Sequence, residues 1–112
     1  TIIYRRDTTL LRLLAHLDDV GDIERFVSRE LGPVLEYDAQ HRPPLMPTLL
    51  ALLSSDSKVA AAERLGVSRQ TMHQKSQILE GMLGLVPNAP LTRRAAVTLA
   101  AQLWQWRTTN TL

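Results

Sequence analysis

The polar residues of one predicted helix, Arg69–Leu83, are of the types that recognise bases in double-stranded DNA. At about 100° per residue, a helix brings five of them onto one continuous face. These residues, here called the polar face, are Arg69, Gln70, His73, Gln74 and Gln77. Arginine and glutamine can each form paired hydrogen bonds with the edge of guanine or adenine in the major groove. We interpret this face as free of acidic and large apolar residues, since Glu63 and Glu80 are expected to lie elsewhere. The polar face therefore predicts contacts to base edges.

The amino ends of two successive helices could add contacts to the phosphate backbone. Ser57 and Ser68 are predicted to cap these helices, because a serine hydroxyl accepts hydrogen bonds from the first free amides. Lys58 adds an ammonium group and Thr71 a hydroxyl close to helix amino ends, which attract phosphate. We therefore expect Ser57, Lys58 and Thr71 to bind phosphate and Ser68 to face the groove. Replacing Lys58 with alanine should weaken binding to all sequences evenly and reduce its salt dependence.

Four residues at fixed spacing predict a tight turn between the helices Lys58–Leu65 and Arg69–Leu83. Such a turn needs a small residue where the helices meet, a glycine with positive φ, and apolar residues beside the turn and on the second helix. These positions are filled by Ala62, Gly66, Val67 and Met72. The segment Gly66–Thr71 also resembles the turn of lac-repressor-type motifs. The spacing favours a helix-turn-helix, and the alternative is an αα-hairpin that only packs.

The remaining polar residues do not form the sites that enzymes or metalloproteins need. The three histidines, His16, His41 and His73, are isolated from other ligand-type residues, and the sequence contains no cysteine. Neither a glycine-rich phosphate loop nor a nucleophile motif is present, so we expect no cofactor, no metal and no enzymatic activity. Arg93 and Arg94 either touch phosphate or form the solvated first turn of the last helix.

The composition indicates one domain built from packed helices. Of the 112 residues, 45% are hydrophobic and only 4% aromatic, so the core must consist mainly of leucine, alanine, valine and isoleucine. That composition favours helices over a sheet sandwich. The net charge of +2 permits nucleic-acid binding without indicating it. No apolar run reaches the roughly 20 residues of a membrane span, and the absence of cysteine fits a cytoplasmic location.

The first half of the chain is predicted to be helical from Thr8 onward, because its apolar residues recur at helical spacing. A break at Asp19–Gly21 and a cap at Asp22 separate the first helix from the second. Gly32–Pro33 predicts a joint in the second helix, since glycine and proline both interrupt helices. A short helix over Val34–Asp38 is then expected to lead into a loop.

The second half is predicted to contain the remaining helices. After the loop Gln40–Pro44, Pro47 lies early in a helix, where a missing amide is tolerated. A last helix is expected after Pro90, with a buried stripe of Leu91, Ala95, Leu99, Leu103 and Trp106. Ser76 faces inward and must either bond a carbonyl one turn back or leave a weak point in the core. The expected fold is all-α, with a winged-helix-like or homeodomain-like three-helix core and extra helices at both ends. Residues 1–5 are expected to form an unpaired strand or a tail.

Several of these segments resemble the C-terminal part of the PucR/CdaR-type transcription regulators, which control purine catabolism and sugar-diacid metabolism. Leu31–Asp38 resembles the family's joint before its helix-turn-helix domain, and Leu45–Leu53 resembles the first helix of that domain. Val59–Thr71 is similar to the motif itself. Ile78–Leu85 matches the end of the motif less closely, and Arg94–Trp106 resembles the last helix.

The resemblance implies a division of the chain near residue 38. Residues 1–38 would be the remnant of a GGDEF-like domain with linking helices, because Ile2–Tyr4 and Leu10–Leu17 resemble that domain's last strand and helix. Residues 39–112 would be the DNA-binding domain. Since the chain begins with threonine rather than methionine, we expect a piece of a longer protein. The implied protein is a bacterial cytoplasmic regulator that binds double-stranded DNA as a homo-oligomer, a dimer or higher, under the control of upstream effector-sensing domains.

The predicted recognition helix departs from the family pattern, which is rich in arginine. Arg69 and Thr71 match, and Gln70 replaces an asparagine, but a tyrosine, a leucine and at least two arginines of the pattern are absent. Because phosphate neutralisation supplies much of the affinity for DNA, a monomer should bind weakly, and dimerisation should double the contacts. The alternative function is a helical interaction or dimerisation module that no longer binds DNA, which the missing arginines and Ser76 favour.

Overall fold

The computed structural model describes residues 21–110, and these form an all-helical fold, as predicted. Its helices are α2 (Asp22–Gln40), α3 (Met46–Ser54), α4 (Lys58–Leu65), α5 (Arg69–Leu83) and α6 (Leu91–Asn110). No strand occurs within this range, and the predicted strand at residues 1–5 and the helix predicted from Thr8 lie outside it. Between residues 21 and 110, no helix is long and apolar enough to cross a membrane.

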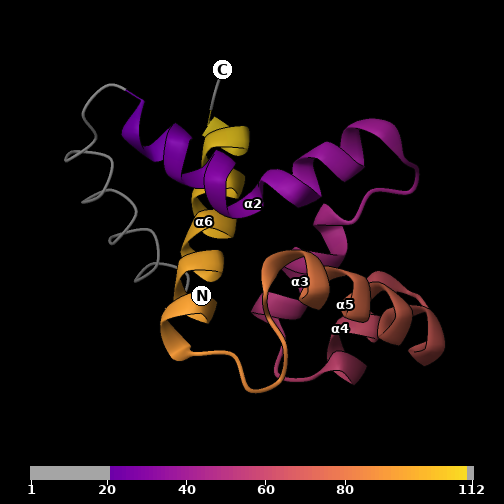
Figure 1. The fold of residues 1–112 in the computed structure, drawn as a ribbon. Helices are drawn as coiled ribbons and strands as arrows, with labels where there is room; N and C mark the ends of the chain where they lie inside the picture. The colour runs from indigo at the N-terminus through magenta and orange to yellow at the C-terminus, as the bar shows by residue number, and fades with distance from the viewer. Residues whose placement is uncertain (1–20, 111–112) are drawn as a thin grey trace.

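The helices pack as a pair and a group of three. α2 lies across α6, while α3, α4 and α5 gather beside them, and α5 also contacts α2 (Figure 1). One buried cluster joins α2, α3, α5 and α6, with Leu31, Leu49, Leu79 and Val97 among its members. A second, smaller cluster joins α3, α4 and α5. The boundary near residue 38 stays a prediction, although α2 runs through this position and shares a core with the helices that follow.

The amino end of α2 differs from the predicted one. The N-cap is Gly21, with a φ of 82°, and Asp22 is the first helical residue rather than the cap. No side chain caps this end of the helix. The Asp22 carboxylate pairs instead with Arg25, one turn later, so it stabilises the first turn from within the helix.

The joint predicted at Gly32–Pro33 is wrong, because α2 continues through it as a single helix. An interior proline removes one backbone hydrogen bond and bends a helix, and α2 is visibly bent in Figure 1. Leu31 and Val34, which flank these two residues, are fully buried in the main core. Core packing on both sides of the proline therefore keeps the two halves in one element.

The start of α3 is set by a carboxylate from the end of α2. Asp38 accepts hydrogen bonds from the backbone N–H groups of Leu45 (2.6 Å) and Met46 (3.0 Å). Leu45 is the N-cap residue, but its side chain has no oxygen to satisfy these amides. Pro47 lies in the first turn, as predicted. Asp38 thus takes the place of a local cap, although it lies seven residues before Leu45. Sequence patterns for helix caps involve only neighbouring residues, so they do not predict this contact.

The buried side of α6 corrects the predicted stripe. Leu91 is 81% exposed, Ala95 is exposed, and Leu99 and Trp106 are only half-buried. The α6 residues that are fully packed into the core are Val97, Ala100, Ala101 and Leu103, of which only Leu103 was in the predicted stripe. The reason lies in the partner helices, because α6 packs against α2 and α3, and the cluster that joins these helices buries this side of α6.

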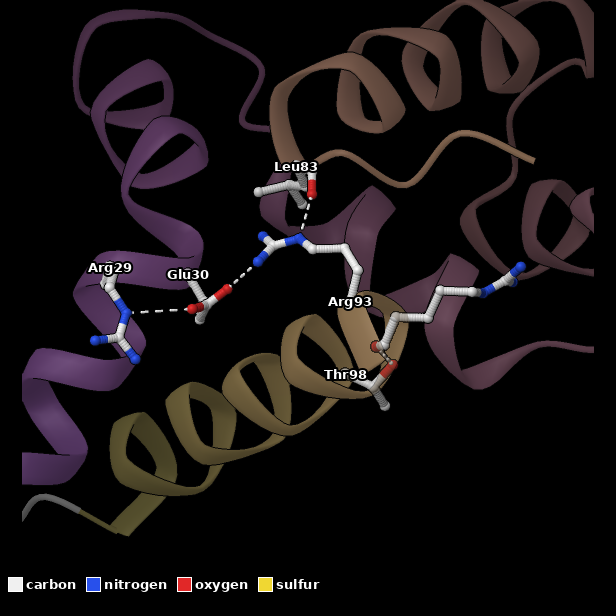
Figure 2. A network of polar contacts seen from close by, with 6 residues as sticks. Arg29, Glu30, Leu83, Arg93 and Thr98 are labelled. Carbon is white, nitrogen blue, oxygen red and sulfur yellow. Dashed lines mark hydrogen bonds and ion pairs between the residues drawn. The ribbon is translucent and has the colours of Figure 1, made fainter. Parts of the chain in front are cut away.

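A network of polar contacts joins α2, α5 and α6, and Figure 2 shows the Arg93 side chain at its centre. Glu30 of α2 is 9% exposed, and its carboxylate pairs with the Arg93 guanidinium of α6. The Nε–H of Arg93 also donates to the carbonyl of Leu83, at the end of α5, over 2.8 Å. Arg29 donates to the other oxygen of Glu30 over 3.3 Å. Arg93 is therefore a structural residue, so its expected place as a solvated side chain is wrong, and its expected contact with phosphate stays a prediction.

Replacing Arg93 with methionine should lower the free energy of unfolding by about 2 kcal/mol, because Glu30 would stay buried without its main partner. The effect should be smaller than for a fully buried pair, since the Arg93 side chain is 34% exposed. Urea unfolding measures it. The double variant Glu30→Met/Arg93→Met should recover most of the loss.

The matched control is Arg94→Met, which removes the same charge from the next, exposed residue. That change should alter the free energy of unfolding by less than about 0.5 kcal/mol. Equal losses for Arg93→Met and Arg94→Met would contradict the structural role of the Glu30–Arg93 pair.

Candidate nucleic-acid interface

α4 begins and ends where its local sequence predicts. The Oγ of Ser57 accepts a hydrogen bond from a first-turn amide over 3.1 Å, and Gly66 ends the helix with a φ of 69°. The N–H of Gly66 donates to the carbonyl of Glu63 (3.2 Å). The N–H of Val67 donates to the carbonyl of Ala62 (3.1 Å). This pair of bonds is a Schellman ending, which needs a residue with positive φ, so Gly66 sets the direction in which the chain leaves α4.

The residues predicted to support the turn pack together between α4 and α5. Ala62 and Met72 are buried in the smaller cluster with Ala51 of α3 and Ala61 of α4, and Val67 packs against them. Small side chains on α4 leave room for α5, and the flexible Met72 side chain fills the remaining space. The contacts of α3 with α4, α4 with α5 and α3 with α5 make this a three-helix group around the turn.

The amino end of α5 is capped by a reciprocal pair of side chains. Ser68 Oγ accepts from the N–H of Thr71 over 3.1 Å and donates to the Thr71 hydroxyl over 3.0 Å. Ser68 is exposed and Thr71 is half-buried. The predicted cap is confirmed, and both hydroxyls that we expected near DNA already stabilise the first turn of α5.

The polar face of α5 is fully on the surface, since all five of its residues are exposed: Arg69, Gln70, His73, Gln74 and Gln77. The opposite side of the helix is buried through Met72, Ser76, Leu79 and Leu83. The buried Ser76 hydroxyl donates to the carbonyl of His73 over 2.9 Å, the kind of bond that its position predicted. α5 is thus held by one side and presents hydrogen-bonding side chains on the other.

Glu80 corrects the view that this side of α5 lacks an acid. It lies seven residues after His73, about two helical turns, and therefore on the same side of the helix. Its carboxylate pairs with the Lys58 ammonium of α4, with 3.4 Å between Nζ and Oε2. Lys58, predicted to contact phosphate, is therefore already paired within the chain. The seven-residue spacing could have revealed Glu80, whereas nothing in the sequence predicts its partner.

Two hollows lie beside Lys58. One, of about 210 Å³, is lined by Lys58, Val59, Arg69, Met72 and His73. The other, of about 340 Å³, includes Lys58, Glu80 and Arg94 in its lining. Residues with basic side chains from α4, α5 and α6, namely Lys58, Arg69 and Arg94, therefore line these two hollows. In the part of the chain that the structure describes, no cluster of three or more metal-ligating side chains occurs.

No protein-family model, no characterised protein and no solved structure matches this chain. The resemblance to PucR/CdaR-type regulators therefore stays a prediction from short sequence segments. The function has to be inferred from the geometry of α4, the turn and α5.

Two glycines in this region provide a matched test of the turn. A Cβ added at Gly66 or at Gly81 would meet no atom within 4 Å, so only the backbone conformation distinguishes them. Gly66→Ala should lower the free energy of unfolding by about 1 kcal/mol, because alanine disfavours a positive φ. Gly81→Ala, inside α5, should raise it by up to about 1 kcal/mol, because alanine favours helix. Urea unfolding of both variants measures the difference, and changes of the same sign would contradict the role of Gly66.

Proposed function

We propose that α4, the turn and α5 form the DNA-binding helix-turn-helix of a bacterial transcription regulator, with α5 in the major groove. The observation that carries this proposal is the polar face, whose five residues are all exposed and all of types that bond base edges. The buried side of α5 and the Schellman ending of α4 hold that face in a defined direction. A rigid helix that displays such side chains suits sequence-specific recognition.

The first turns of α5 supply the proposed base contacts. In helix-turn-helix proteins, residues near the amino end of the recognition helix reach the base edges. Arg69 and Gln70 occupy the first turn of α5, and His73 follows one turn later. Arginine pairs best with guanine and glutamine with adenine. Gln74 and Gln77 extend the contact along the groove. The proposed protein acts in the cytoplasm through DNA binding alone, without enzymatic activity or a cofactor.

The proposed interface depends on oligomerisation, because few cations are available to phosphate. Two of the basic residues near α5 are engaged within the chain, Lys58 with Glu80 and Arg93 with Glu30. Phosphate contacts supply nearly all sequence-independent affinity for DNA. We therefore propose that the protein binds as a homodimer, or a higher oligomer, on an operator with two-fold symmetry. Effector-sensing domains upstream in a longer chain would control that binding.

A second candidate function is a protein-interaction or dimerisation module without DNA binding. The observation that favours it is the exposure of two apolar side chains close to the polar face, Val59 at 42% and Ile78 at 45%. Exposed apolar side chains can contribute to a surface that binds a protein partner. The two functions differ in a simple observable, since an interaction module would leave DNA unbound at every salt concentration.

The DNA proposal predicts that Gln70→Ala relaxes sequence preference. Loss of one paired contact should cost about 1–3 kcal/mol on the preferred DNA and little on other sequences. Selection of bound duplexes from a random-sequence pool, followed by affinity measurements on the selected and a scrambled duplex, tests this.

The matched control is Gln105→Ala, which changes an exposed glutamine on α6, away from the polar face. It should bind both duplexes as the parent chain does. If Gln70→Ala and the parent chain bind every duplex equally, α5 does not lie in the groove as proposed.

A further inference from the structure

The ion pair between Lys58 and Glu80 links two helices at the edge of the polar face. Lys58 is the first residue of α4, and Glu80 lies in the last two turns of α5. The side chains are 46% and 24% exposed, and Nζ lies 3.4 Å from Oε2. A pair this exposed contributes little to the stability of the fold, so its main consequence is for the charge of the surface.

Lys58 occupies a position from which it could otherwise serve the proposed DNA interface. It lines the hollow of about 210 Å³ together with Arg69 and His73, two members of the polar face. The side chain of a lysine is long and flexible and can point its ammonium in more than one direction. An ammonium that is paired with a carboxylate neutralises no phosphate, whereas the same group pointing toward DNA would release a counterion.

We propose that Glu80 holds the Lys58 ammonium away from the phosphate backbone and so lowers the affinity of this surface for DNA. The inference rests on the proposed function, and it revises the expectation that Lys58 is a phosphate contact in the parent chain. Glu80 acts here as a positioning residue, since it touches Lys58 and not the DNA. The affinity of this surface for DNA then depends mainly on base contacts from the polar face.

The test uses four proteins, the parent chain, Glu80→Gln, Lys58→Met and the double variant, with a fluorescently labelled, mixed-sequence DNA duplex. Affinity is measured by anisotropy over a series of NaCl concentrations. Glu80→Gln should bind about twofold to fivefold more tightly at low salt, with a salt slope steeper by about 0.9, the value for one added phosphate contact. Lys58→Met should leave the slope of the parent unchanged but should remove the whole gain from Glu80→Gln.

The matched control is Glu63→Gln, which removes one negative charge from an exposed position on α4. It should change the affinity less than twofold, because Glu63 does not hold Lys58. Circular dichroism and thermal melting of all the variants establish that each is folded.

The outcomes separate this inference from the function on which it rests. If the parent chain binds DNA but Glu80→Gln has the same affinity and salt slope, only the inference about Glu80 is wrong. It is also wrong if Lys58→Met lowers the slope equally in both backgrounds, because Lys58 would then contact phosphate whether or not Glu80 is present. If neither the parent chain nor any variant binds DNA at any salt concentration, the proposed function is wrong and the inference is wrong with it.

Discussion

The arrangement of this fold depends on one buried carboxylate. The Glu30 carboxylate is buried, so its oxygens need partners within the protein, and the Arg93 guanidinium from α6 supplies the main one. Because arginine carries several donors in a fixed plane, Arg93 also satisfies the carbonyl of Leu83 at the end of α5. A pair of this kind adds little net stability compared with apolar packing, but it tolerates few alternative arrangements. It therefore joins the end of α5 to both α2 and α6.

In the region around the turn, one set of residues packs α4 against α5 and a different set faces outward. Small and apolar side chains, centred on Ala62 and Met72, bring α4 and α5 together, and none of the polar face takes part in that packing. The exposed residues of α5 are consequently free to be chosen for contacts outside the protein. Their chemistry is dominated by glutamine, and Lys58, at the amino end of α4, is engaged by Glu80. A surface of this kind favours directional hydrogen bonds over general attraction to phosphate, which agrees with the weak net charge of +2.

Much of the helical layout and the candidate face could be predicted because the signals are local. Ser57, Gly66, Ser68 and Gly84 bound α4 and α5 through hydrogen bonds that span at most five residues, so each boundary is encoded in a few adjacent positions. The exposure of the polar face followed from helical spacing alone. The same spacing also places Glu80 on that side of α5, so this acid too is encoded locally.

The sequence by itself determined where α4 and α5 begin and end, which residues support the turn, and which side of α5 faces outward. Only the tertiary structure decided that α2 continues through Pro33 and that Asp38 caps α3. It also decided that α6 buries Ala100 and Ala101. Finally, it paired Lys58 and Arg93 with acids on other helices. The physical reason is the separation in sequence between the residues that interact. Caps and turns are bonds between neighbours in the chain, whereas burial of a helix face and pairing of a charge depend on partners such as Glu30 and Arg93, which lie 63 residues apart.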